Sequence, residues 1–203
     1  MLQSIRDYPI LYAVIAVLVP LCILAWVKAS RASARRNANR DAVIAQLKEY
    51  HALRREFAEP TTEQMATAEP TRLIAGLCAN VQHRLEESDD PDALFATLPE
   101  AAQFAYALGY LLEDGSEQLS HFFRRNGAPL TDVAQRAVQT FLSPEFAEVF
   151  TALFNIHNGT APDHVNDIPA LDDRARTIMQ QSSCWQTTQA YFLKNITAFT
   201  INP

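Results

Sequence analysis

The fold is decided by residues 129–159, PLTDVAQRAVQTFLSPEFAEVFTALFNIHNG, which carry two successive helical patterns. In each half, apolar residues recur at spacings of three and four, so each helix would have one apolar and one polar face. Ser143 and Pro144 lie between the halves and suit a helix start, since Ser caps free backbone amides and Pro fits the first turn. Asn158 and Gly159 favour a helix end. These residues therefore predict two helices joined by a short turn.

The chain on either side shows the same periodicity in shorter pieces. Gly is rare, with 5 in 203 residues, and no convincing pair of strands can be assigned. We expect further helices over 41–59, 71–87, 91–97, 99–113, 116–126 and 170–199, with a linker at 60–70 and a loop at 160–169. The sequence thus predicts an all-α fold, in which an N-terminal transmembrane helix precedes an orthogonal multi-helix domain.

Residues 9–27, PILYAVIAVLVPLCILAWV, carry no charge and have no polar face. As a helix they would extend about 28 Å, close to the bilayer's apolar thickness of about 30 Å. A cleaved signal peptide is the main alternative, but the basic residues follow this segment instead of preceding it. A lipoprotein signal would need a small residue before Cys22, where Leu21 stands. We therefore expect an uncleaved transmembrane helix.

A basic cluster follows the apolar segment and predicts its orientation. By the positive-inside rule this end lies in the cytoplasm, so residues 1–8 would lie outside the cell. The sequence predicts a single-pass protein of the inner (cytoplasmic) membrane, with a juxtamembrane stalk at 28–59, the linker at 60–70 and a cytoplasmic helical domain at 71–203. The lipid contacts are expected from 9–27 and from the basic flank of Lys28, Arg31, Arg35, Arg36 and Arg40.

The charge of the chain is asymmetric. From Asp41 onward there are 22 acidic residues against 11 basic ones, although the whole chain carries only −6. Such a domain repels nucleic acid and attracts basic surfaces, so we expect a protein partner and no direct nucleic-acid binding. A well-hydrated acidic surface without a partner is the alternative interpretation.

No motif for a cofactor, a metal ion or a catalytic centre is evident. The histidines form no HExxH or similar spacing, and His157, Asp163 and His164 offer only a weak metal set. Cys78 and Cys184 lack the spacing of a zinc site or a disulfide framework. We therefore expect no cofactor and no enzyme activity.

One loop motif is nevertheless distinctive, in residues 113–127, EDGSEQLSHFFRRNG. Gly115 would end one helix, Ser116 would cap the next, and Asn126 with Gly127 would end that one in a left-handed turn. Gln118 could satisfy buried backbone groups at this corner. The motif can be read as purely structural or as a binding site.

This motif resembles that of a DNA-mimic-like family of small helical bacterial domains of unknown function. The residues that match are Glu113, Gly115, Gln118, Phe122, Phe123 and Asn126, which are our candidate binding residues. The resemblance covers about 99–199, with Tyr191, Asn195 and Phe199 resembling the family's C-terminal ending. Asp114 and Ser116 depart from the family pattern. The resemblance implies a helical fold and a shared motif, and leaves the function open.

Three functions follow from these observations. The first is a membrane-anchored acidic interaction module that faces the cytoplasm and binds a basic protein. The second is a DNA mimic, whose carboxylates would imitate phosphates and occupy a nucleic-acid-binding protein. The third is an enzyme with a site near Glu113–Asn126, in which Glu113, Asp114 and Glu117 would work beside His121 as acid–base groups.

Overall fold

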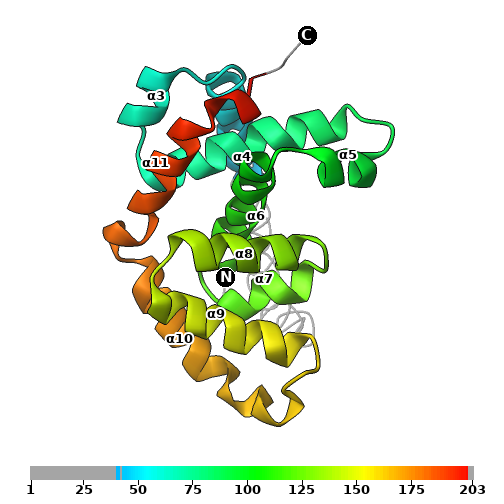
Figure 1. Cartoon of the computed structure of the whole chain (residues 1–203), viewed down its shortest axis with the longest axis vertical. Helices are drawn as coiled ribbons and strands as arrows, with labels where there is room; N and C mark the ends of the chain where they lie inside the picture. Colours follow the sequence, from blue (N-terminus) through cyan, green and yellow to red (C-terminus); the bar gives the residue numbers. More distant parts are fainter. Residues whose placement is uncertain (1–39, 42, 201–203) are drawn as a thin grey trace, which may run out of the picture. The chain divides into compact units, whose positions relative to one another are not determined.

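The structure, a computed structural model, describes residues 40, 41 and 43–200. Every regular element in this part of the chain is helical, which confirms the all-α prediction. Residues 43–56 are helical. The elements that follow (Figure 1) are α3 (Thr62–Thr67), α4 (Pro70–Glu86), α5 (Pro91–Thr97), α6 (Glu100–Gly115), α7 (Leu119–Arg125), α8 (Leu130–Phe141), α9 (Pro144–His157), η1 (Pro162–Asp167), α10 (Ile168–Met179), η2 (Ser182–Trp185), α11 (Gln186–Lys194) and η3 (Ile196–Ala198).

The chain divides into two compact units, Met1–Glu49 and Tyr50–Pro203. In the first unit the described residues are helical, and Val43, Ile44 and Leu47 are exposed. The second unit contains all the elements from α3 to η3 and the hydrophobic core.

The predicted transmembrane helix requires a correction. Residues 9–27 lie outside the described part of the chain, and in the described part no helix combines the length and the apolar character that a bilayer crossing needs. Even α4, with 17 residues, falls short of the roughly 20 apolar residues required and carries charged side chains. The fold is accordingly an all-helical domain, and the membrane assignment with its single-pass inner-membrane localisation is withdrawn.

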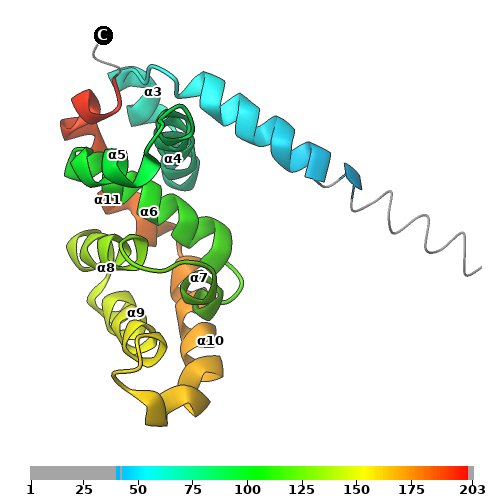
Figure 2. The same cartoon turned by 90° about the vertical axis from the view of Figure 1, so that its right-hand side faces the viewer.

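The second unit is organised around α6. Both views place α6 between α4 on one side and the α7–α8 pair on the other (Figures 1 and 2). Small residues let the helices approach closely, since Gly109 of α6 lies directly against Cys78 of α4. Gly76 of α4 makes room for a side chain instead, the fully buried ring of Phe57, which follows the helix over residues 43–56. The α4–α6 pair is therefore fitted with little spare space.

Aromatic rings fill the rest of the core in two groups. Phe123 contacts Phe150 at a ring-centroid distance of 4.9 Å, and Phe122 contacts Phe123 at 5.3 Å, edge to face. In the other group Phe141 lies 4.6 Å from Tyr191, so the C-terminal segment is part of the core. Edge-to-face and tilted pairs of this kind add to the stabilisation from burial.

Several predicted helix ends are confirmed. The Ser143 hydroxyl accepts a hydrogen bond from the Phe146 amide at 3.2 Å, with Pro144 in the first turn of α9. Gly159 has φ +73°, the left-handed conformation expected after that helix. The helix predicted over 91–97 is also found.

Other local predictions were wrong. Asn126 has φ −121° and extended backbone, so α7 does not end in a left-handed turn. The side chain of Ser116 does not cap α7, which begins at Leu119. The single helix expected over 170–199 is divided into α10, η2, α11 and η3. The stretch 60–70, expected to be a linker, contains α3, which has a capping box at Thr61 and a buried Met65.

The contact of Gly76 with Phe57 yields a test of the core. In Gly76→Ala the new methyl group would overlap the Phe57 ring, and overpacking of this kind costs about 1–3 kcal/mol. That range equals or exceeds the roughly 1 kcal/mol that Ala gains over Gly in a helix, and the overlap with a buried ring favours its upper part. We expect a lower urea midpoint for Gly76→Ala. Gly127→Ala, where a methyl group meets open space, should stay within about 0.5 kcal/mol, and equal midpoints for the two variants would contradict the packing.

Candidate functional site

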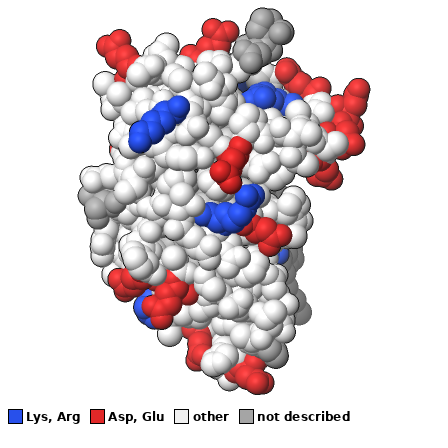
Figure 3. All heavy atoms as spheres, in the orientation of Figure 1, with Lys and Arg blue, Asp and Glu red and all other residues white. Residues whose placement is uncertain are grey.

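Acidic residues gather where α4 ends and α5 begins. We call the five exposed carboxylates of this turn the acidic corner: Glu86, Glu87, Asp89, Asp90 and Asp92. They belong to a long stretch without positive charge, since the chain has nine acidic residues and no Lys or Arg between Arg84 and Arg124. Figure 3 shows this gathering at the upper right, over α5 and the end of α4.

The position of these carboxylates is only partly explained by folding. Asp90 caps α5, because its Oδ1 accepts a hydrogen bond from the Ala93 amide at 3.0 Å, and Asp92 suits the first turn of that helix. Glu86 and Glu87, in contrast, lie at the C-terminal end of α4, where the helix dipole disfavours negative charge. Their placement does not help α4 and is consistent with a role in binding.

The corner is only weakly neutralised by its neighbours in the described part of the chain. Arg54 Nη1 lies 3.8 Å from Glu86 Oε2, and His83 Nε2 lies 3.3 Å from Glu87 Oε1. Glu86 Oε1 also accepts hydrogen bonds from Gln82 Nε2 at 3.1 Å and from the Tyr50 hydroxyl at 3.5 Å. Such exposed ion pairs contribute little to stability, so the negative potential of the corner remains open to a partner.

Two half-buried tyrosines of α6, Tyr106 and Tyr110, form a ring pair near this corner. The rings are 4.9 Å apart and their hydroxyls 3.4 Å apart, while Phe95 of α5 lies 5.4 Å from Tyr106. Burial raises the pKa of both phenols, and the charge of Glu86 raises the pKa of Tyr106 further. Both hydroxyls therefore stay protonated at neutral pH, and Tyr106 is the ring that links this pair to α5 and to Glu86.

The six residues of the predicted motif do not share one surface. Gly115, Phe122 and Phe123 are buried in the core, and Glu113 and Gln118 are exposed. Gln118 was predicted to satisfy buried backbone groups, and this prediction was wrong because its side chain is exposed. The exposed and buried members face different surroundings, so the motif residues do not converge on a ligand.

The remaining motif residue, Asn126, closes the corner between α6 and α7. Its side-chain amide donates to Asp114 Oδ2 at 2.9 Å and to the Phe122 carbonyl at 2.9 Å. Asp114 also pairs with Arg125, and this pairing raises the pKa of the guanidinium. These contacts give Asp114 and Asn126 a structural role.

The start of α7 is held by a residue that sequence reasoning missed. Asp172 of α10 is 4% exposed, and its carboxylate accepts hydrogen bonds from the Ser120 amide and hydroxyl, each at 2.7 Å. Arg124 Nη2 donates to the same hydroxyl at 3.0 Å. Asp172 thus serves as a helix cap from another helix, 52 residues away in sequence.

In the described part of the chain, the histidine and cysteine side chains lie in separate surroundings. Within the described ranges no three His, Cys, Asp or Glu side chains are placed to hold a metal ion. His164 pairs with Asp167 at 2.9 Å, while the His157 ring stacks on Phe123 at 5.4 Å. Burial raises the pKa of the Cys78 thiol to about 12 and that of Cys184 to about 11, so both thiols are protonated and unreactive at neutral pH.

The comparisons with known proteins gave no match, either to a protein-family model, to a curated protein or to a solved structure.

The Asp172 cap can be tested by substitution. Asp172→Ala would leave the Ser120 amide buried without an acceptor, and we expect a loss of about 2–3 kcal/mol in the free energy of unfolding. The control is Asp173→Ala, because the neighbouring side chain is 72% exposed and should change stability by about 0.5 kcal/mol or less. Urea denaturation measures both, and a similar loss in the two variants would count against the cap.

His157 predicts a pH dependence of stability. Its Nε2 is buried without a hydrogen-bond partner, and burial together with the charge of Arg124 lowers its pKa, against a smaller opposing effect of Asp172. A histidine with a lowered pKa stabilises the fold fully above its ordinary pKa of about 6.5, and this contribution is lost as the pH falls. Relative to His157→Phe, the wild-type chain should lose stability on acidification below pH of about 6.5. The free energy of unfolding from urea denaturation, measured against pH for both proteins, checks this prediction. A constant difference between wild type and His157→Phe at all pH values would contradict it.

Proposed function

We propose that this chain is a protein-interaction module that binds a basic, arginine-rich segment of a partner at the acidic corner. The observation that carries the proposal is the set of five exposed carboxylates at the α4–α5 turn, two of which lie at the end of α4 that disfavours them. Opposite charge would bring a basic segment to this turn quickly and orient it there.

The tyrosine pair favours arginine over lysine in the partner. A guanidinium can lie flat against the aromatic faces of Tyr106 and Tyr110 while it donates hydrogen bonds to a carboxylate. The two rings pack against each other and Tyr106 also packs against Phe95, so these contacts hold the rings in place before binding. A preformed surface of this kind limits the loss of side-chain freedom on association.

A DNA mimic would need carboxylates spaced like phosphates over an extended face. Several acidic side chains outside the corner have basic neighbours, since Glu100 lies 3.2 Å from Arg136, and Glu145 and Glu148 each lie 3.9 Å from Arg174. These features favour a short basic segment as the ligand over a whole nucleic-acid-binding surface. The resemblance to the DNA-mimic-like family remains a prediction from the sequence motif.

The proposal can be tested with the full-length chain and a fluorescein-labelled octa-arginine peptide in fluorescence anisotropy. The triple variant Glu87→Gln, Asp89→Asn, Asp92→Asn leaves the Asp90 cap intact. If each lost exposed pair contributes about 0.5 kcal/mol, the three together should weaken binding about tenfold at low salt. Octa-lysine should bind the wild-type chain less tightly than octa-arginine.

The matched control removes the same charge elsewhere, in Glu59→Gln, Glu63→Gln, Asp132→Asn. These side chains are exposed, and screening should limit their effect to about twofold or less at physiological salt. Equal weakening in both triple variants would show that only net charge matters, and the acidic corner would then not be the recognition surface.

A further inference from the structure

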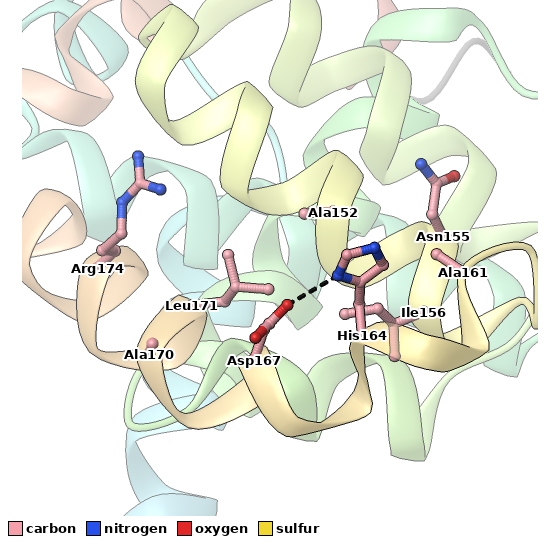
Figure 4. Close-up of a pocket in the computed structure, with 9 residues that line it drawn as sticks. All are labelled: Ala152, Asn155, Ile156, Ala161, His164, Asp167, Ala170, Leu171 and Arg174. Carbon is pink, nitrogen blue, oxygen red and sulfur yellow. Dashed lines mark hydrogen bonds and ion pairs between the residues drawn. The ribbon is translucent and has the colours of Figure 1, made fainter.

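A groove between α9 and α10 lies apart from the acidic corner and is closed at one end by η1. Its volume is about 410 Å³, within the range of small-molecule sites. Figure 4 shows the side chains that line it, which are Ala152, Asn155, Ile156, Ala161, His164, Asp167, Ala170, Leu171 and Arg174.

The groove exists because small residues occupy the positions of α9 and α10 that face each other. Ala152 and Ile156 are four positions apart on α9, and Leu171 of α10 faces the same space (Figure 4). Three alanines contribute only methyl groups to the lining, so the two helices leave the space between them unfilled. Ile156 and Leu171 provide an apolar floor.

The two ends of the groove differ in charge. Toward one end the Asp167 carboxylate contacts the His164 ring, with Oδ2 2.9 Å from Nδ1 (Figure 4). At the other end Arg174 lies 3.9 Å from both Glu145 and Glu148, which is too long for a hydrogen bond. Both glutamates are exposed, at 64% and 75%, and can turn toward water. Within the described residues the guanidinium of Arg174 thus has ion-pair partners but no hydrogen-bond acceptor.

We propose that this groove binds an amphipathic monocarboxylate, with its aliphatic chain on the floor of Ile156 and Leu171 and its carboxylate on Arg174. The apolar floor suits an apolar body, and the guanidinium of Arg174, which has no hydrogen-bond acceptor among the described residues, can donate two parallel hydrogen bonds to one planar anion. The site is independent of the acidic corner, and neither proposal rests on the other.

The test uses sodium octanoate, below its micelle concentration, with the full-length chain labelled at isoleucine and leucine methyl groups. We expect saturable chemical-shift changes at Ile156 and Leu171. Octylammonium and acetate should bind at least fivefold more weakly, because the first lacks the anion and the second lacks the chain.

Two variants locate the contacts, and one serves as the control. Arg174→Gln should weaken octanoate at least fivefold and leave octanol within twofold, whereas Ala152→Leu, which fills the groove, should weaken both. Arg136→Gln removes an exposed arginine on another helix and should change neither. Matching melting temperatures would show that the variants are folded. Equal binding of octanoate and octylammonium, unaltered binding by Arg174→Gln, or no saturable shift at Ile156 and Leu171 would each overturn the proposal.

Discussion

The close approach of α4 to α6 is the constraint on which the rest of this structure depends. It requires Gly109 of α6 opposite Cys78 of α4, because a methyl group at this position would overlap the Cys78 side chain. This contact sets the direction of α4 and thereby determines where its acidic end projects. It also sets the face on which α6 presents Tyr106 and Tyr110. The geometry of the candidate recognition surface therefore depends on one buried glycine in the core.

Much of the helical architecture could be predicted because its signals are local. Ser143 with Pro144 defines a helix start through atoms of the same turn, and the positive φ of Gly159 follows from the chemistry of one residue. Errors occurred where a helix boundary depends on a contact with a residue far away in sequence. The start of α7 depends on Asp172, 52 residues downstream, which no pattern around Ser116 could reveal. The helix α3 was missed for another reason, since its capping box at Thr61 is a local signal, and Met65 then packs in the core. The apolar run at 9–27 suggested a membrane helix from composition alone, and the described helices do not provide one.

The candidate site divides in the same way. The excess of acidic residues was visible in the composition, but the position of the acidic corner near Tyr106 depends on the packing of α4 against α6 and of Phe95 against Tyr106. The motif at 113–127 allowed two interpretations, because Gly, paired Phe and Asn are common both at corners between helices and in binding loops. In the structure these residues face several directions, with Phe122 and Phe123 in the core and Glu113 in solvent. A sequence motif indicates that residues act together, whereas only the fold shows whether they act on one another or on a ligand.

The carboxyl end of α4 has a thermodynamic consequence. Glu86 and Glu87 add negative charge to backbone carbonyls that already carry the negative pole of the helix. A cation bound there would reduce the repulsion between these glutamates and the backbone carbonyls, and would thereby stabilise the C-terminal end of α4. Occupancy and order at this turn are then linked: the last turn of α4 would fray more easily in the empty protein and become firmer in the complex. The same two glutamates would make the stability of this turn depend on ionic strength, because dissolved ions screen their charge as a bound cation would.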